Sequence, residues 1–280
     1  MDRYAVMGYP VAHSLSPQIH ALFAKATGQP MVYERIGPHP EAFEEAVAQF
    51  RSQGGKGLNI TLPFKERAYA LADRRSARAQ AAGAANTLDF RAGDIYADNT
   101  DGVGLVRDLE RNLGCKLLGR SVLLLGAGGA ARGVVEPLLA AGVTRLVVAN
   151  RTPSRAEILL DQLRHSGGIA PDRMSHCMAC GLDGIPQGSY HFIINATSGS
   201  LSGEVPALPG WVFGPQALAY DMVYGKGSTP FMTLARDQGV ARSVDGLGML
   251  VEQAAESFHL WRGVYPETAP VLQLLRAELG

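Results

Sequence analysis

Short apolar runs alternate with longer amphipathic stretches along the whole chain. In the first part, short apolar runs predict strands, and stretches with apolar residues spaced three and four apart predict helices. The expected strands cover residues 4–8, 31–37, 57–61, 85–90 and 95–100, and the expected helices cover 16–28, 40–54, 64–73, 77–82 and 101–114. Regular alternation of strands and helices is typical of a mainly parallel sheet covered by helices.

A second series of the same kind begins at Ser121. The expected strands cover 121–126, 144–150, 191–197 and 218–224, and a glycine-rich turn with its helix covers 126–142. Further helices are expected at 152–167, 229–239, 248–263 and 269–279. Pro137 lies inside the first helix of this series, where it should bend the helix or cost a hydrogen bond. The chain therefore divides into two α/β units, with the break near residues 101–120.

Two helix starts carry a recognisable signal. Ser16 is followed by Pro17, and we expect Ser16 to be the N-cap of a helix that ends before Gly28. Thr152 and Pro153 predict the same arrangement for the helix that follows the strand at 144–150.

Composition narrows the class of protein. The chain has 280 residues, of which 46% are hydrophobic and 19% charged, and its formal net charge is zero. This balance is typical of a globular protein with a sizeable core and gives no reason to expect a nucleic-acid partner. The absence of a long apolar run and of a signal-peptide pattern argues against a membrane or secreted protein. We expect a cytoplasmic protein, because three cysteines are too few for a disulfide framework.

Cys177 and Cys180 form a C-x-x-C pair that follows His176. Structural zinc sites usually have four ligands, and the chain has no second pair of cysteines. The segment reads as a loop or a short strand, whereas a redox site of the thioredoxin type would open a helix. We therefore expect two ordinary thiols and no metal site.

A dinucleotide fingerprint follows the strand at 121–126. Gly126, Gly128 and Ala131 form a G-x-G-x-x-A pattern between that strand and a helix, which is the context the fingerprint requires. The first glycine permits the tight turn, the second lets backbone N–H groups approach a pyrophosphate, and the helix N-terminus contributes positive charge.

The end of the next strand distinguishes the two dinucleotides. An NAD site usually carries an acidic residue there for the ribose 2′-hydroxyl. This chain instead has Asn150, Arg151 and Thr152, with Arg155 one turn later. Guanidinium groups are suited to a 2′-phosphate, so the sequence favours NADP.

Polar side chains collect around the ends of the first strands. Asn59 and Thr61 are two residues apart in the strand at 57–61 and should share a face, and Lys65 follows them. Asp101 comes where a strand meets a helix, and is either an N-cap or an ionised partner of Lys65. Ligands bind at the carboxyl ends of such strands, where a cation–carboxylate pair serves proton transfer at an alcohol oxygen.

Ser14 and Ser16 lie just before a helix N-terminus. Two serines two residues apart at the positive end of a helix make either a cap or a site for a small carboxylate. Asn86 lies at the start of the strand at 85–90.

From residue 4 to the C-terminal helix, the chain resembles the shikimate dehydrogenase family. The matching segments, in chain order, are HSLSPQIH, GGKGLNITLPFKE, AGAANTL, DNTDGVGL, LLLGAGGAARGV, NRTPSRAE, IINATSG, YDMVY and DGLGMLVEQAAESFHLWRG. The family reduces 3-dehydroshikimate to shikimate with NADPH, on the route to chorismate and the aromatic amino acids. The resemblance thus implies an NADP-dependent oxidoreductase that acts on a CH–OH group. Departures such as Tyr9, where the family commonly has Asn, and Ala77, where relatives often have an acid, do not touch the proposed catalytic pair.

The resemblance implies roles for the polar residues of the first unit. Ser14 and Ser16 would hold the substrate carboxylate with help from Tyr224. Lys65 and Asp101 would meet the reacting oxygen and its neighbour. The residues that would bind the ring hydroxyls or orient their neighbours are Asn59, Thr61, Asn86 and Gln253.

The resemblance also implies three groups of cofactor residues. The pyrophosphate loop would be Gly126, Ala127, Gly128, Gly129 and Ala130. The adenosine phosphate would be surrounded by Asn150, Arg151, Thr152 and Arg155. The nicotinamide would be lined by Thr197, Met222, Gly246 and Met249.

We therefore expect two α/β domains with the active-site cleft between them. The first is a mainly parallel βαβ substrate domain formed by 1–101 with 246–280, and the second is a doubly wound Rossmann-type NADP domain formed by 102–245. The expected partner is a small molecule, and the protein should be a monomer or a homodimer.

Three alternatives remain open from the sequence. The enzyme could use quinate, or both acids, with either NADP or NAD. A methylenetetrahydrofolate dehydrogenase has a similar two-domain layout and lysine, but would not need the two serines or Asp101. A non-catalytic NADP-binding protein would be expected to lose Lys65 or Asp101, and both are present.

Overall fold

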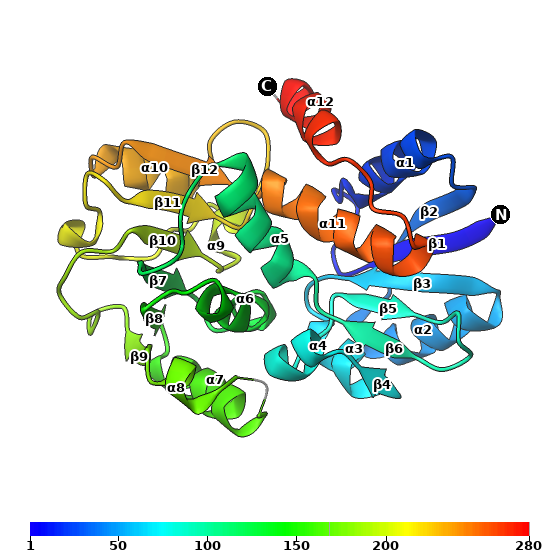
Figure 1. Ribbon diagram of the computed structural model, residues 1–280, viewed down its shortest axis with the longest axis horizontal. Helices are drawn as coiled ribbons and strands as arrows, with labels where there is room; N and C mark the ends of the chain where they lie inside the picture. The colour runs from blue at the N-terminus through cyan, green and yellow to red at the C-terminus, as the bar shows by residue number, and fades with distance from the viewer. Residues whose placement is uncertain (168, 280) are drawn as a thin grey trace.

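The computed structural model describes residues 1–167 and 169–279. Two six-stranded sheets form two lobes, and helices α5 (Asp101–Arg107) and α11 (Leu247–Arg262) lie between them (Figure 1). Among the described residues, no helix has both the length and the apolar character needed to cross a membrane.

The first sheet has the strand order β2-β1-β3-β5-β6-β4. Its strands are β1 (Asp2–Met7), β2 (Met31–Ile36), β3 (Gly55–Ile60), β4 (Arg74–Arg75), β5 (Thr87–Asp89) and β6 (Tyr96–Asp98). Strands β2 and β3 both pair in parallel with β1, and β4 pairs in parallel with β6. Only β5 is reversed, since it pairs antiparallel with β3 and with β6. The expectation of a mainly parallel sheet is confirmed.

Helices cover both faces of the first sheet. They are α1 (Ser16–Thr27), α2 (Phe43–Ser52) after the 3₁₀ turn η1 (Pro40–Ala42), α3 (Lys65–Leu71), α4 (Ala77–Ala82), α11 and α12 (Ala269–Leu279). On one face, Phe43 and Phe64 stack with their ring centres 4.5 Å apart and pack in one cluster with Leu58 of β3. On the other face, Trp261 of α11 stacks on Tyr4 of β1 at 4.7 Å. Helix α11, which follows the second sheet in the chain, thus returns to the first lobe.

The second sheet has the strand order β12-β11-β10-β7-β8-β9, and every pairing is parallel. Its strands are β7 (Ser121–Leu125), β8 (Arg145–Asn150), β9 (Cys177–Gly181), β10 (Phe192–Asn195), β11 (Leu218–Asp221) and β12 (Arg242–Asp245). This order runs outward in both directions from the first strand of the unit, as in doubly wound dinucleotide-binding folds. The expected Rossmann-type architecture is confirmed.

Helices also cover both faces of the second sheet. They are α6 (Gly129–Ala140), α7 (Pro153–His165), α8 (Pro171–Met174), α9 (Gly199–Ser202) and α10 (Pro230–Asp237), with the 3₁₀ turn η3 (Gly210–Val212). Leu124 of β7 packs in the cluster with α5, α6 and α7, while the neighbouring Leu123 packs in the cluster with α10. Because side chains alternate along a strand, the apolar run of β7 supplies both faces at once.

Some details of the expected elements are wrong. Ser16 is the first residue of α1 rather than its N-cap; Leu15 occupies the cap position, and the Ser14 hydroxyl accepts the Ser16 N–H at 3.2 Å. Thr152 is the N-cap of α7, but its side chain makes no capping bond. The helix expected at 101–114 is α5 followed by a π-helical turn, η2 (Asp108–Asn112). The elements β4, β12, α8 and α9, each two to four residues long, were not expected from the sequence.

Glycines bring α5 into close contact with helices on either side. A Cβ at Gly102 would lie 2.3 Å from the Gly133 carbonyl oxygen and 2.2 Å from Pro137 of α6. A Cβ at Gly104 would lie 2.7 Å from the Gln253 Cβ of α11. Since Asp101 is the first residue of α5, this packing places Asp101 at the junction of the two lobes.

Candidate active site

Lys65 and Asp101 form a largely buried ion pair. Lys65 opens α3 directly after β3, and Asp101 opens α5 directly after β6, so both lie at the carboxyl ends of their strands. The Lys65 Nζ donates to the Asp101 Oδ2 at 2.6 Å, and the two side chains are 12% and 7% exposed. The pair expected from the sequence is therefore present, and its low exposure strengthens the electrostatic interaction.

Asn86 orients the other oxygen of the Asp101 carboxylate. Its side-chain amide donates to Asp101 Oδ1 at 2.9 Å, to Thr100 Oγ1 at 2.8 Å and to Gln253 Oε1 at 3.2 Å. The side-chain carbonyl oxygen of Asn86, Oδ1, accepts the backbone N–H of Thr100 at 2.8 Å. Asn86 and Gln253 thus lie beside the Lys65–Asp101 pair.

The two serines lie together at the start of α1. The Ser14 hydroxyl donates to the Ser16 hydroxyl at 3.1 Å. Arg35 of β2 holds this turn by donating from Nε and Nη2 to the Ser14 carbonyl, at 3.0 and 2.7 Å. Tyr224 reaches the same turn from the second lobe: burial raises the pKa of its phenol, and a hydrogen bond with the Leu15 backbone opposes that rise. The structure therefore brings Ser14, Ser16 and Tyr224 together.

Asn59 and Thr61 differ in their surroundings. Asn59 is buried, and its side-chain amide donates to the backbone carbonyl oxygen of Asn86 and to the hydroxyls of Thr87 and Ser257. Thr61 lies just past the end of β3 and is only half-buried, with its methyl group against Gly8. The two residues are near the same strand end, but Asn59 belongs to the interior.

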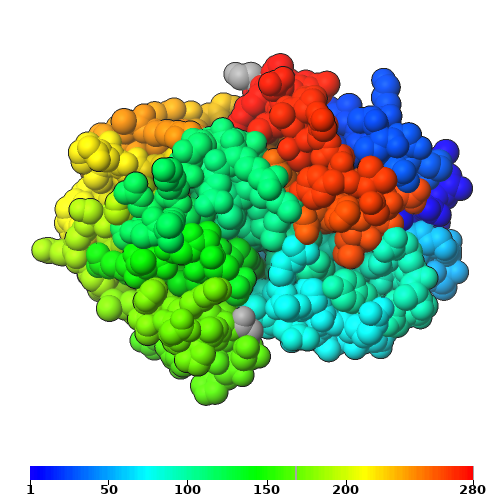
Figure 2. All heavy atoms as spheres, in the orientation of Figure 1, coloured from blue at the N-terminus to red at the C-terminus, as the bar shows by residue number. Residues whose placement is uncertain are grey.

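The glycine-rich turn comes close to the catalytic pair. Gly126 has a φ of +104°, which favours glycine, and a Cβ at Gly128 would have no atom within 4 Å. A Cβ at Gly129, the first residue of α6, would lie 3.5 Å from the Cβ of Lys65. The N-terminus of α6 in the second lobe therefore adjoins Lys65 in the first, and Figure 2 shows the two lobes facing each other across a narrow furrow.

The residues expected around the adenosine phosphate follow β8. Asn150 ends the strand, and its amide donates to the Thr152 carbonyl at 2.9 Å. Arg151, Thr152 and Arg155 are exposed, and in the described part of the chain neither guanidinium has a protein partner. Both cations are therefore available to an anion.

The residues expected around the nicotinamide lie at the carboxyl ends of β10, β11 and β12. The Thr197 hydroxyl donates to the Asn195 side chain at 2.7 Å, and Thr197 contacts the position a Gly126 Cβ would take. Met222 and Gly246 are in backbone contact, since a Gly246 Cβ would lie 2.3 Å from the Met222 carbonyl oxygen. Met249 is 7% exposed and packs in the core cluster of the second lobe. The carboxyl ends of both sheets therefore meet at one region.

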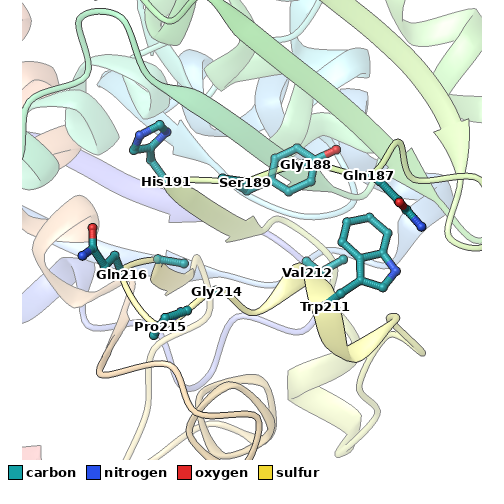
Figure 3. Close-up of a pocket in the computed structure, with 11 residues that line it drawn as sticks. Gln187, Gly188, Ser189, His191, Trp211, Val212, Gly214, Pro215 and Gln216 are labelled. Carbon is teal, nitrogen blue, oxygen red and sulfur yellow. The ribbon is translucent and has the colours of Figure 1, made fainter.

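A separate cavity of about 700 Å³ lies at the amino ends of strands in the second sheet (Figure 3). It is lined by residues from the segments that precede β10 and β11, among them His191, Trp211 and Gln216. These segments lie at the amino ends of the strands, opposite the glycine-rich turn. None of the site residues expected from the sequence is among the described residues that line it.

The cysteine pair lies on the outer strand β9. Cys177 and Cys180 are free thiols, and burial raises the pKa of Cys177 to about 11. Cys177 is therefore protonated at neutral pH. Within residues 1–167 and 169–279, no group of three or more His, Cys, Asp or Glu side chains is placed to hold a metal ion.

Four residues around the site were not expected from the sequence: Tyr33, Arg35, Thr100 and Ser257. A signal existed for some of them. Tyr33 and Arg35 are two residues apart in a predicted strand, so their side chains share one face. Ser257 follows Gln253 by about one helical turn. The sequence did not show that these faces point toward the site.

Comparison with known proteins places the chain in a family. The family described as shikimate dehydrogenase substrate binding domain matches residues 6–88, shikimate / quinate 5-dehydrogenase matches 108–180, and shikimate 5'-dehydrogenase C-terminal domain matches 246–276. Shikimate dehydrogenase (NADP(+)) of Alkalilimnicola ehrlichii is 54% identical over 277 residues, which cover 99% of each chain. The enzyme of that name from Nitrosospira multiformis is 53% identical and covers 100% of this chain and 98% of its own.

Solved structures agree with this assignment. An Ael1 enzyme from Pseudomonas putida has a TM-score of 0.88 at 52% identity and covers 98% of both chains. Shikimate 5-dehydrogenase from Thermus thermophilus, in complex with NADP(H) and shikimate, has a TM-score of 0.82 at 33% identity and covers 99% of both chains. With sequence identity above one half over almost its whole length, the chain belongs to the shikimate dehydrogenase family.

Proposed function

We propose that this protein is an NADP-dependent shikimate dehydrogenase that reversibly reduces 3-dehydroshikimate to shikimate. The observation that carries the proposal is the buried Lys65–Asp101 pair, 2.6 Å between Nζ and Oδ2, beside the first residue of the helix that follows the glycine-rich turn. Proton-handling groups and a dinucleotide site thus adjoin each other. Whole-length relatives that carry the name shikimate dehydrogenase (NADP(+)) support the same activity.

Lys65 handles the proton at the carbonyl oxygen. When bound, NADPH supplies the hydride for the carbonyl carbon. The negative charge that develops on the carbonyl oxygen is stabilised by the Lys65 ammonium, which can give a proton to that oxygen. Asp101 holds Lys65 in place through Oδ2, while Asn86 holds Asp101 through Oδ1. In the reverse direction the same groups receive the proton of the substrate hydroxyl.

The substrate carboxylate binds at the other end of the site. Ser14 and Ser16 provide hydroxyl donors at the start of α1, and Tyr224 adds a phenol. Thr61 and Gln253 contact the ring hydroxyls near the catalytic pair. Asn59 orients its neighbours, because its amide is already bonded within the protein.

The residues present fit an NADP cofactor. The turn of Gly126, Ala127, Gly128, Gly129 and Ala130 would hold the pyrophosphate, because the open space at Gly128 lets a ligand approach the backbone. Arg151 and Arg155 would bind the 2′-phosphate, with Asn150 and Thr152 at its side. The residues along the nicotinamide are Thr197, Met222, Gly246 and Met249.

We also propose the domain division and the cellular setting. The substrate domain is formed by 1–101 with 246–280 and the NADP domain by 102–245, a division supported by two separate sheets. The enzyme acts in the cytoplasm, in the biosynthesis of chorismate and the aromatic amino acids, as a monomer or homodimer without a nucleic-acid partner. Light scattering during size-exclusion chromatography measures the oligomeric state.

The first experiment measures NADPH absorbance with purified protein in four pairings of shikimate or quinate with NADP or NAD. We expect rapid reduction with shikimate and NADP only. Similar rates with quinate or NAD would retain the chemistry and refute the proposed specificity. No rate in any pairing would refute the proposed function.

A further inference from the structure

A side chain outside the expected site connects its two ends. Tyr33 lies on the edge strand β2, and its hydroxyl donates to Asn59 Oδ1 at 2.7 Å. Its ring stacks on His20 of α1, with the ring centres 4.2 Å apart. Burial raises the phenol pKa well above its usual value, and the nearby Ser16 side chain opposes that rise. Tyr33 therefore stays protonated and can act as a fixed donor.

The orientation of the Asn59 amide follows from its neighbours. Its nitrogen faces the backbone carbonyl oxygen of Asn86 at 3.3 Å, and a carbonyl oxygen can only accept. The NH₂ group must therefore point there and toward Ser257 Oγ at 2.9 Å, and the amide oxygen must point toward Tyr33. Tyr33 donates its only proton to Asn59, so its oxygen can only accept hydrogen bonds from other groups.

These bonds form a continuous chain across the first lobe. From Asn59 the chain passes to Thr87 Oγ1 at 3.2 Å, from Thr87 to Asn86 Oδ1 at 3.0 Å, and from Asn86 to Asp101 at 2.9 Å. Strands β2, β3 and β5 each contribute a member, and the bond from Tyr33 to Asn59 passes over β1, which lies between β2 and β3. Tyr33 is thus tied through side chains to the catalytic pair.

Strand β2 holds the serine turn at a second point. Arg35 is two residues after Tyr33, so both side chains lie on the same face of the strand. Arg35 binds the Ser14 backbone carbonyl, and Tyr33 stacks on His20, about one turn after Ser16 in α1. One edge strand therefore contacts both the serine turn and the helix that follows it.

We propose that Tyr33 is a positioning residue for substrate recognition: its hydroxyl orients Asn59 and its ring packs on His20 of α1, so that it places the carboxylate-binding serines at a fixed distance from Lys65 and Asp101. The inference rests on the proposed function of the site. It assigns a role to a residue that does not itself meet the reacting atoms. The substrate carboxylate is bound equally well in the ground state and in the transition state. Loss of the Tyr33 hydroxyl should therefore weaken substrate binding without slowing the chemical step.

The test compares Tyr33→Phe with Tyr4→Phe. Tyr4 is paired in register with Tyr33 on the adjacent strand, and its hydroxyl contacts Arg262 rather than Asn59. Both variants lose one phenolic oxygen from the same part of the sheet. We expect Tyr33→Phe to raise KM for shikimate by about threefold to tenfold with little change in kcat, and Tyr4→Phe to leave both constants within about twofold of wild type.

A second substrate separates positioning from general damage. With shikimate methyl ester, which lacks the carboxylate charge, wild type and Tyr33→Phe should have similar kcat/KM values. An equal loss on shikimate and on the ester, or an equal rise in KM for NADP, would show that the variant only loosens the fold and would overturn the inference. A wild-type protein that oxidises no shikimate would instead contradict the proposed function, and the inference with it.

Discussion

At the scale of single residues, the chemistry depends on where a few charged side chains are placed. Lys65 is only 12% exposed and has one carboxylate partner, whereas Arg151 and Arg155 are exposed and have no protein partner within the described residues. The first arrangement suits proton handling away from water, and the second suits capture of a phosphate from solution.

Replacement of Lys65 tests the first arrangement. We expect Lys65→Ala to lower kcat by ~10²–10⁴-fold, because the developing charge on the substrate oxygen loses its proton donor. KM for shikimate should change little, since the carboxylate and hydroxyl contacts remain. Steady-state kinetics measures both constants, with the exposed Lys25→Ala as a matched control. A near-normal kcat for Lys65→Ala would rule out its assignment.

Replacement of Arg151 tests the second arrangement. Hydrogen bonds to charged groups contribute about 1.5–3 kcal/mol, so Arg151→Ala should raise KM for NADP by roughly tenfold to a hundredfold. KM for NAD, which lacks the 2′-phosphate, should stay the same. Arg236→Ala, an exposed arginine on α10, is the control. A parallel rise in KM for both dinucleotides would show that Arg151 does not select the phosphate.

At the scale of helices and strands, close packing around α5 places Asp101. The helix contacts α6 through Gly102 and α11 through Gly104, and neither position has room for a methyl group. The sequence DNTDGVGL was informative about Asp101, but the two glycines also have a packing role that their spacing did not reveal.

Enlarging Gly104 should separate α5 from α11. The new Cβ would lie 2.7 Å from the Gln253 Cβ and 2.8 Å from the Gln253 backbone nitrogen, and backbone cannot move aside cheaply. We expect Gly104→Ala to lower the free energy of unfolding by about 1–3 kcal/mol and to reduce kcat/KM, because Gln253 moves with α11. Urea unfolding checks the first effect. Gly214→Ala, at a site with no atom within 4 Å, should change neither quantity.

An ion cluster ties α4, α5 and α11 together. Glu256 of α11 accepts from Arg78 of α4 and from Arg107 of α5, each at 2.7 Å. Burial opposes ionisation of Glu256, but hydrogen bonds and charge from the two arginines outweigh it and hold its pKa below the ordinary value of 4.5. A lowered carboxyl pKa gives stability that is present above the ordinary value and is lost as the pH falls through the folded-state pKa.

Acidification should therefore remove the contribution of Glu256. We expect Glu256→Gln to lower Tm at pH 7, where the arginines lose a charged partner, and to differ less from wild type as the pH falls below about 4.5. Thermal unfolding at a series of pH values measures this difference. The exposed Glu267→Gln is the control. A Tm difference between Glu256→Gln and wild type that stays constant with pH would contradict the linkage.

At the scale of the whole molecule, side chains of the two lobes meet next to Lys65. Arg132 in the first turn of α6 reaches across to Glu66, the neighbour of Lys65, with Nε 3.5 Å from Oε1. Arg132 is also bonded to Gln162 of α7 and lies near Gly83 of the first lobe. This ion pair joins the two lobes beside the catalytic pair, where domain closure would bring substrate and cofactor together.

Removal of this ion pair should weaken closure modestly. Glu66 is 61% exposed, and exposed pairs contribute about 0–1 kcal/mol, so Glu66→Gln should lower kcat/KM by no more than about fivefold. The charge reversal Glu66→Arg with Arg132→Glu should recover part of the loss. Kinetics at low and high salt gives the check, because screening should shrink the difference. A salt-independent loss would point to packing instead of charge.

Much of the molecule was accessible from local patterns in the sequence. The order of strands and helices follows from the spacing of apolar residues, and the turn at Gly126 from its need for a positive φ. The cofactor choice predicted from Arg151 and Arg155 depends on neighbours within one strand end and one helical turn. All of these signals join residues a few positions apart, so the sequence by itself determined the two α/β units, the glycine-rich turn and the catalytic pair as candidates.

Only the tertiary structure decided which polar groups are free to bind a ligand. Asn59 resembled a substrate ligand, yet its amide is bonded to Ser257, 198 residues away. Ser16 resembled a cap, yet it is the first residue of α1 and its hydroxyl is bonded to Ser14. Tyr33, Arg35 and the helix contacts of Gly104 became visible only with strand register and helix packing. The physical reason is that a buried polar group must satisfy its hydrogen bonds, and its partners are chosen by the fold across distances that local patterns do not span.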